Sequence, residues 1–196
     1  MKIEPEKILT QFYKIKPNNK IFLISGNEIT LINEVKEFIT NYFKNQNYSN
    51  ITTFSHKQME PENFYNQNLF ENKKKIFIYY EQKNIDLDFL KKIDIKNTII
   101  IIIDTKIKNS SKIKKILDSH NDYITINCYK LDKNKKEFLL KDFLQKNSIK
   151  LSSESYWYLI DNTDSNFALF NNEIKKLYNF KDEFLNVGNL RKLISN

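Results

Sequence analysis

Residues 20–43 have the sequence KIFLISGNEITLINEVKEFITNYF. The apolar run Ile21–Ile24 predicts a buried strand, and Ser25–Asn27 have the glycine and polar side chains of a turn. Apolar residues then recur at helical spacing from Ile29 to Phe43, so a helix is expected there. A strand, a tight turn and a helix in this order are typical of the first unit of a parallel α/β sheet.

This unit lacks the features that bind a nucleotide. A P-loop carries several glycines and then Lys-Ser or Lys-Thr, because bare backbone N–H groups must surround the phosphates while the lysine reaches the outer ones. Here Gly26 is the single glycine of the turn, and the next lysine, Lys36, lies about two turns into the predicted helix. We therefore expect an architecture shared with nucleotide hydrolases in a chain that does not hydrolyse nucleotides itself.

Further strands and helices alternate in the first two thirds of the chain. Strands are predicted at residues 51–54, 75–80, 98–103 and 123–126, which are short and rich in β-formers. Two of them, 75–80 and 98–103, are apolar on both faces, as the interior of a helix-covered parallel sheet requires. Short helices are expected from Pro61 to about Phe70 and over residues 110–117. The fold class is therefore α/β, with a parallel sheet of five strands flanked by helices.

The pattern becomes purely helical near Cys128. Helices are expected over residues 133–147, 152–161, 165–180 and from 187 or 189 to 194. The second and third begin at Ser152 and Ser165, whose side chains can cap the first turn. We expect an α/β domain over residues 1–127 and a small helical domain over residues 128–196.

No catalytic or metal-binding constellation is evident. A single cysteine, Cys128, excludes an internal disulfide and is expected to be a buried hydrophobe. His56 and His120 have no ligand partners at metal-binding spacing and are expected at the surface. Asp104 ends the isoleucine strand, where phosphate-transfer enzymes carry acidic residues, but Thr105 follows it instead of Glu. A helix-cap or loop role for Asp104 is favoured, and no catalytic residue, cofactor or metal is expected.

The net charge of +8 and the pI of about 9.3 suggest contact with nucleic acid. Arg191 is the only arginine, however, so the usual arginine clamps for bases and phosphates are absent and a general lysine bias explains the charge better. The charged segment Met1–Lys7 differs from a signal peptide, and the isoleucine run 99–103 is too short to span a bilayer. We expect a cytoplasmic protein without membrane contact.

Residues 66–75, NQNLFENKKK, contain the most suggestive local feature. Leu69 and Phe70 are adjacent at the end of a short polar helix, and neighbours on a helix point about 100° apart, so both cannot face one core. In a partner's pocket the pair would bury apolar surface worth about 3–6 kcal/mol gross. Alternatively, both side chains close the helix end against the sheet.

Several segments match one known family in order and spacing. They are residues 21–28, residues 68–70 with the basic stretch and strand up to 80, the strand 99–103, and the helical segments 143–149 (FLQKNSI) and 172–177 (NEIKKL). In this order they resemble the delta subunit of the bacterial DNA polymerase III clamp loader. The resemblance implies an AAA+-like α/β domain without a functional P-loop, followed by a helical lid. Family members carry a third helical domain that joins the subunits in a pentameric collar, and residues 1–196 correspond to the first two domains only.

The resemblance also implies a role in DNA replication. Leu69 and Phe70 would enter the hydrophobic pocket of the ring-shaped β sliding clamp, with Gln67 as a candidate polar anchor two residues before Leu69. The subunit would stabilise an opened clamp so that primed DNA can enter, while sibling ATPase subunits of the loader hydrolyse ATP. It would have no catalytic site of its own and would count as a polymerase component only through the holoenzyme.

Two alternatives remain open from the residues alone. One is a lysine-rich DNA-binding module on a degenerate AAA+ scaffold, which would bind DNA without a clamp and lose that binding steeply with salt. The other is an atypical P-loop NTPase, which would require a phosphate-binding lysine that residues 26–35 do not supply.

Overall fold

The computed structural model describes residues 1–15, 20–55, 74–80, 97–106, 112–119, 123–180 and 186–194. The chain divides into two compact units, Met1–Cys128 and Tyr129–Asn196. Gln67, Leu69, Phe70 and both histidines lie outside the described residues, as does the short helix predicted to end at Phe70.

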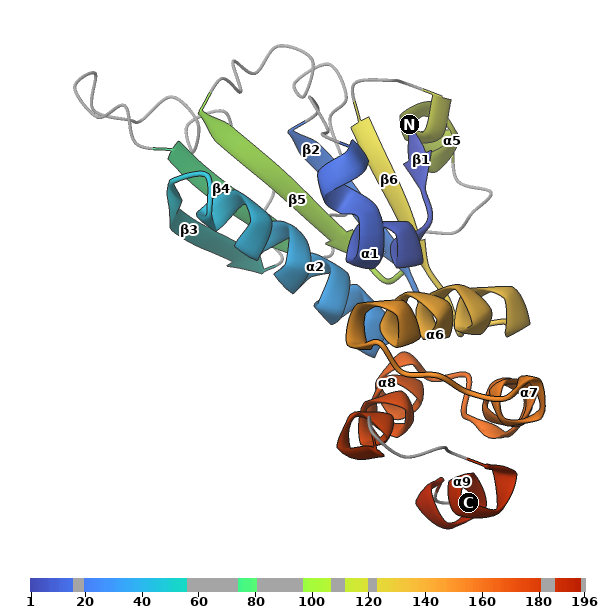
Figure 1. Cartoon of the computed structure of the whole chain (residues 1–196). Helices are drawn as coiled ribbons and strands as arrows, with labels where there is room; N and C mark the ends of the chain where they lie inside the picture. The colour runs from blue at the N-terminus through green and yellow to red at the C-terminus, as the bar shows by residue number, and fades with distance from the viewer. Residues whose placement is uncertain are drawn as a thin grey trace. The chain divides into compact units, whose positions relative to one another are not determined.

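The first unit is built on a six-stranded sheet in which every pair of neighbouring strands is parallel (Figure 1). The strands are β1 (Lys2–Ile3), β2 (Ile21–Gly26), β3 (Tyr48–Ser55), β4 (Lys74–Tyr80), β5 (Thr98–Asp104) and β6 (Tyr123–Cys128). Their order across the sheet is β1-β6-β2-β5-β4-β3. Strands β2, β5 and β6 are buried along their whole length. The isoleucine run of β5 is apolar on both faces, as burial on both faces requires, whereas β6 carries the buried polar residues Thr125 and Asn127 on one face. The predicted parallel α/β sheet is confirmed.

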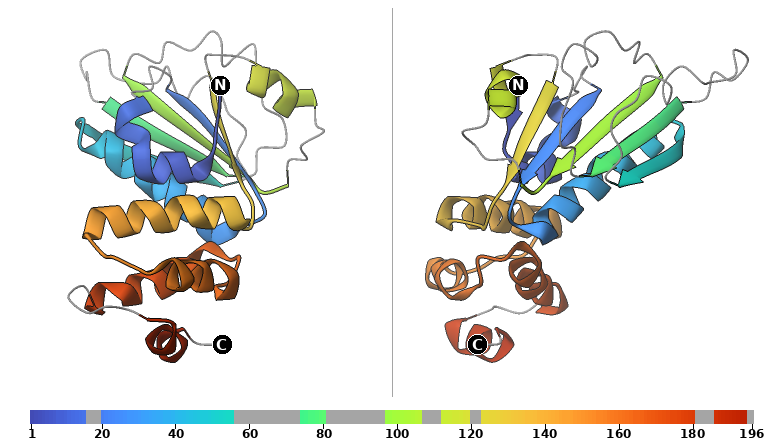
Figure 2. Two further views of the ribbon diagram at one scale, coloured as in Figure 1. Left: turned by 45° about the vertical axis from the view of Figure 1, so that its right-hand side comes forward. Right: turned by 180° about the vertical axis from the view of Figure 1, so that it is seen from behind.

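Helices α1 (Pro5–Ile15) and α2 (Ile29–Lys44) cover one face of this sheet, and the view from behind in Figure 2 shows the opposite face. Aromatic rings fill the space between these helices and the sheet. The Phe22 ring lies 6.3 Å from Phe12 of α1 and 5.8 Å from Phe43 of α2. Because side chains alternate along a strand, Phe22 facing these helices turns Ser25 toward the opposite face. Helix α5 (Lys112–Ser119) contacts β6 and donates to Ser25 on that face.

Two elements at the N-terminus were not predicted from the sequence, so the expected number of five strands is one short of the six in the sheet. Strand β1 pairs with β6 at the sheet edge, and α1 begins with Pro5 at its first position. Ile8 and Phe12 of α1 are both fully buried, four residues apart on one face of the helix. The sequence also placed the end of β2 too early, because Ser25 and Gly26 still belong to the strand.

The second unit is helical. Its elements are α6 (Lys133–Asn147), α7 (Ser153–Asn162), α8 (Phe167–Lys176), the 3-10 turn η1 (Leu177–Phe180) and α9 (Val187–Leu193). Each α-helix begins after a residue whose side chain accepts a hydrogen bond from the first turn, and these caps are Asp132, Ser152, Asn166 and Asn186. The core includes Leu139, Leu140, Leu159, Ile160, Phe170 and Leu190.

Two details of this unit differ from the predictions or add to them. The predicted cap Ser165 is wrong: Asn166 Oδ1 accepts from Leu169 N at 3.1 Å, while the Ser165 carbonyl accepts from Leu131 N at 2.7 Å.

Lys136 is buried, and its ammonium donates to the carbonyls of Ile160 (3.2 Å) and Thr163 (2.5 Å) at the C-terminal end of α7. A cation at this end of a helix complements its dipole.

Within the described parts of the chain, no helix is both long enough and apolar enough to cross a membrane.

Candidate functional site

The turn between β2 and α2 occupies the place where open parallel sheets usually bind ligands. Such ligands sit outside the carboxyl ends of the strands, at the point where successive connections run to opposite sides. Strand β2 lies between β5 and β6, and the chain runs from β2 to the edge strand β3 before it returns to β6 on the other side. The contacts of residues 25–28 therefore decide whether a nucleotide can bind here.

Gly26 and the two residues after it are bound to the end of β6. Gly26 has a φ of +139°, and a Cβ added there would lie 1.9 Å from the Cys128 carbonyl oxygen. The same oxygen accepts hydrogen bonds from the backbone N–H groups of Asn27 (3.1 Å) and Glu28 (3.2 Å). Gly26 is thus required by a close approach of two backbones, and the N–H groups that would face a phosphate donate to the chain itself.

The N-terminus of α2 is occupied by an internal carboxylate. Glu28 Oε1 accepts from Thr30 N at 2.9 Å, from Leu31 N at 3.4 Å and from the Thr30 hydroxyl at 2.5 Å. The Glu28 residue is only 3% exposed. A helix N-terminus attracts anions because its N–H groups are unpaired and its dipole is positive there. In this chain the Glu28 carboxylate takes the position that a phosphate would take.

A buried lysine closes the opposite face of the same strand ends. Ser25 Oγ donates to Asn127 Oδ1 at 3.1 Å. Lys114 of α5 donates from its ammonium to Ser25 Oγ at 2.9 Å and also to Asn127 Oδ1. Lys114 is 1% exposed. Sequence reasoning did not find this residue, because nothing in the local pattern distinguishes it from the other lysines of its helix.

Asp104 lies beside Ser25 in the β2–β5 register and is 7% exposed. Its Oδ1 accepts from the backbone N–H of Lys106 at 2.8 Å, which is the hydrogen bond of a turn that follows a strand. Asp104 is the last residue of β5 and so belongs to the strand, not to a loop or a helix cap as favoured from the sequence, although its side chain caps the turn that follows. Among the residues that the structure describes, no three His, Cys, Asp or Glu side chains are grouped so that they could hold a metal ion. Cys128 is buried, as predicted.

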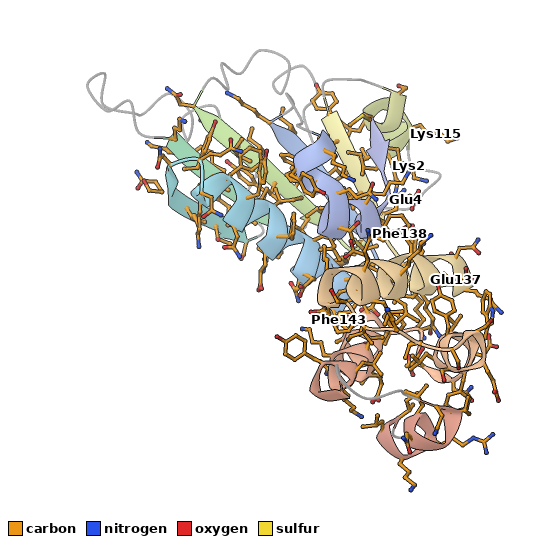
Figure 3. The ribbon with its side chains drawn as sticks, in the orientation of Figure 1. Lys2, Glu4, Lys115, Glu137, Phe138 and Phe143 are labelled. Carbon is orange, nitrogen blue, oxygen red and sulfur yellow. The ribbon has the colours of Figure 1, made fainter. Side chains whose placement is uncertain are left out.

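Several lysines are balanced by nearby carboxylates. Figure 3 labels Lys2 and Glu4 at the start of the chain, and these two side chains pair at 3.3 Å. In the second unit the pairs are Lys133–Asp161, Lys135–Asp132, Lys146–Asp142 and Lys176–Glu173. The Lys133 ammonium also lies 4.7 Å from the ring centre of Trp157, which is 40% exposed. Each of these five lysines therefore has a carboxylate partner, which reduces the positive charge that it offers to a phosphate backbone.

Comparison with known proteins finds similarity to solved structures. The Bacillus subtilis DNA clamp loader delta protein (YqeN) superposes with a TM-score of 0.67 at 12% sequence identity, over 97% of this chain and 62% of that one. The chain thus spans less than two thirds of that protein. No protein-family profile matches the sequence, and no curated protein matches it. At 12% identity the likeness shows the fold alone, an α/β sheet followed by helices.

Two other solved structures are more distant. Domain III of the Thermotoga maritima replication initiation protein DnaA has a TM-score of 0.47 at 12% identity, over 97% of this chain and 89% of that one. The Thermotoga maritima RuvB Holliday junction branch migration motor has a TM-score of 0.46 at 11% identity, over 96% of this chain and 65% of that one.

Proposed function

We propose that this chain is a non-enzymatic subunit of a clamp loader, of the delta type, which binds a ring-shaped sliding clamp and opens it during DNA replication. The observation that carries the proposal is the β2–α2 turn. Its N–H groups and helix terminus are bound by Cys128 and Glu28, in a fold similar to that of a clamp loader delta protein. A chain with this fold and a self-occupied phosphate site is suited to a role in which other subunits bind the ATP.

The proposed contact is made by Leu69 and Phe70, with Gln67 beside them as a polar anchor. Sequence position supports this choice, because the pair follows a polar stretch and precedes the basic residues 73–75, the last two of which begin β4. Two large apolar side chains in one pocket would form the centre of a small interface. The residues 1–127 would act as the clamp-binding domain and residues 128–196 as the lid, in the cytoplasm and together with ATPase subunits and primed DNA.

Opening the clamp requires only differential affinity. A ligand shifts an equilibrium by the difference between its affinities for the two states, so this chain need only bind an open clamp more tightly than a closed one. No step of this mechanism requires a catalytic side chain or a nucleotide in the β2–α2 turn. ATP bound to the other subunits would decide when the clamp-binding surface is presented.

The test is calorimetric titration of the chain with the sliding clamp of the same organism. Leu69→Ala combined with Phe70→Ala is expected to remove binding while the circular dichroism spectrum stays unchanged. A matched control removes two apolar side chains that are 52% and 53% exposed in the second unit, Leu169→Ala with Tyr178→Ala, and is expected to bind normally. Equal binding by both double variants would eliminate Leu69 and Phe70 as the clamp contact.

A further inference from the structure

The sheet of the first unit ends in two edge strands that differ in length and charge (Figure 1). Strand β1 has two residues, and its exposed residue, Lys2, is charged. Strand β3, Tyr48–Ser55, has eight residues, and its sequence YSNITTFS contains no charged residue, no proline and no glycine. Short strands and charged side chains protect the edge of a sheet against pairing with another chain. Strand β1 has both of these features, and β3 has neither.

The outer side of β3 is accessible. Five consecutive residues, 49–53, are exposed, and so is the last residue, Ser55. Among the described residues, no backbone hydrogen bond outside the sheet ladder involves β3. An edge strand presents a row of N–H and C=O groups that its one neighbouring strand does not bind. Strand β3 therefore offers these groups to a further strand.

Most of β3 also has the regular geometry that strand pairing requires. Its one register shift against β4 lies between Tyr48 and Asn50, and residues 50–55 pair with β4 without interruption. On one face Ile51 is 37% exposed, although its neighbour on β4 is fully buried. On the other face the Phe54 ring is half-buried and stacks on an aromatic ring of β4 at 4.6 Å. An added strand would therefore cover apolar surface on both faces.

We propose that β3 is a self-association surface, at which two copies of this chain pair their β3 strands antiparallel about a two-fold axis through Thr52. A two-fold contact joins the same surface of both copies, so a charged strand would face its own charge, and β3 carries none. With Thr52 opposite its copy, Ile51 lies opposite Thr53 of the second copy. Pairs of β-branched residues and of threonines stabilise neighbouring strands. The proposal does not depend on clamp binding and can hold or fail independently of it.

The charges near β3 favour the antiparallel direction. The Lys74 ammonium donates to the Gln46 carbonyl at 3.1 Å and lies 5.1 Å from the ring centre of Tyr48, so a positive charge is held at the start of β3. Antiparallel pairing centred on Thr52 would put the two starts about 26 Å apart along the strands, at about 3.3 Å per residue. This separation exceeds the Debye length of about 8 Å at physiological salt. Parallel pairing would bring the two charged starts side by side.

The test is sedimentation equilibrium of the full chain over a series of concentrations. A contact made by one pair of strands is smaller than the roughly 1,200 Å² of a stable interface, so a weak dimer with a Kd on the order of 100 µM is expected. The average mass should rise with concentration from 23.6 kDa toward twice that value.

Thr52→Lys tests the symmetric contact directly. It places two like charges opposite each other and removes a pair of threonines, which should raise the Kd of the dimer about five- to thirtyfold. Asn33→Lys is the matched control, because it adds the same charge at an exposed position of α2 and should leave the Kd unchanged. Thr52→Glu should also weaken the dimer. An equimolar mixture of Thr52→Lys and Thr52→Glu should associate at least as tightly as the wild type, because opposite charges then meet.

Three results would overturn the proposal. A wild-type chain that stays at 23.6 kDa at every concentration would exclude a second copy and leave the edge to a strand of a different protein. Equal weakening by Thr52→Lys and Asn33→Lys, or a mixture of the two Thr52 variants that does not associate, would place the contact elsewhere. If circular dichroism shows that Thr52→Lys does not fold, Thr53→Lys takes its place, since Thr53 is also exposed and lies opposite Ile51 of the second copy.

Discussion

Replacement of Glu28 tests whether the carboxylate at the start of α2 stabilises the first unit as its contacts indicate. An N-cap residue contributes about 0.5–2 kcal/mol relative to alanine. Glu28 also accepts the Thr30 hydroxyl at 2.5 Å and is nearly fully buried, so its removal leaves a further donor unsatisfied at a cost of about 1 kcal/mol. We therefore expect Glu28→Ala to lower the free energy of unfolding of the first unit by about 1.5–3 kcal/mol.

The charge and the hydrogen bonds of Glu28 can be separated. Glu28→Gln keeps an oxygen acceptor and removes only the interaction of the charge with the helix dipole, so a loss of about 0.5–1 kcal/mol is expected. Glu37→Ala removes an exposed glutamate from the same helix and should stay within about 0.5 kcal/mol of wild type. The order of the three variants is therefore Glu28→Ala, then Glu28→Gln, then Glu37→Ala.

The assay is hydrogen exchange of the β5 amides, which are buried in the centre of the sheet and should exchange only when the first unit unfolds. A loss of about 1.5–3 kcal/mol corresponds to exchange that is about 12- to 150-fold faster. Fluorescence of Trp157, the only tryptophan, monitors the second unit in the same sample. If Glu28→Ala and Glu37→Ala accelerate β5 exchange equally, Glu28 does not support the turn in the way its contacts indicate.

Two further predictions concern the second unit and use Trp157 fluorescence during urea denaturation. Leu140→Ala removes a fully buried side chain of α6 and should lower the free energy of unfolding of the second unit by about 2–5 kcal/mol. Leu169→Ala, at a 52% exposed position, should lower it by less than about 1 kcal/mol. Equal losses in the two variants would contradict the packing described for α6. Burial lowers the pKa of Lys136, and the nearby Asp164 and Asp161 offset this only in part. At pH values between that lowered pKa and the pKa of about 10.4 in the unfolded chain, the unfolded chain binds more protons than the folded one. The free energy of unfolding of the wild type, relative to that of Lys136→Met, should therefore rise with pH in this range and be constant below it. A relative free energy of unfolding that falls toward pH 10 would refute this.

The sequence predicted the parts of the fold that depend on local pattern. Strands β4, β5 and β6 follow from runs of β-branched and aromatic residues, and α6 begins and ends at the predicted residues 133 and 147. The edge strand β1 has two residues and no periodicity, so its pairing with β6 could only be seen in the folded chain. Helix α1 did carry a signal, in Pro5 followed by apolar residues at helical spacing, and the charged flanking residues obscured it.

Only the part of the candidate site around Gly26 could be predicted from the sequence, and the distant residues that contact it could not. The lone Gly26 and the missing phosphate lysine indicated a turn that does not bind nucleotide, and this came from the local sequence. The reason that Gly26 is required lies at Cys128, about a hundred residues further along the chain, where two backbones approach closely. Similarly, Lys114 meets Asn127 and Ser25 only because α5 packs beside β6. Contacts of this kind are set by the sheet order and have no local sequence pattern.

The most direct test of the proposed function is titration of the wild-type chain with the sliding clamp, in parallel with and without Mg-ATP. The phosphate positions of the β2–α2 turn are held by Glu28 and Cys128, so the chain should bind the clamp with the same affinity in both conditions. Absence of binding in both, or binding that appears only with Mg-ATP, would contradict a clamp-opening subunit that acts without a nucleotide of its own.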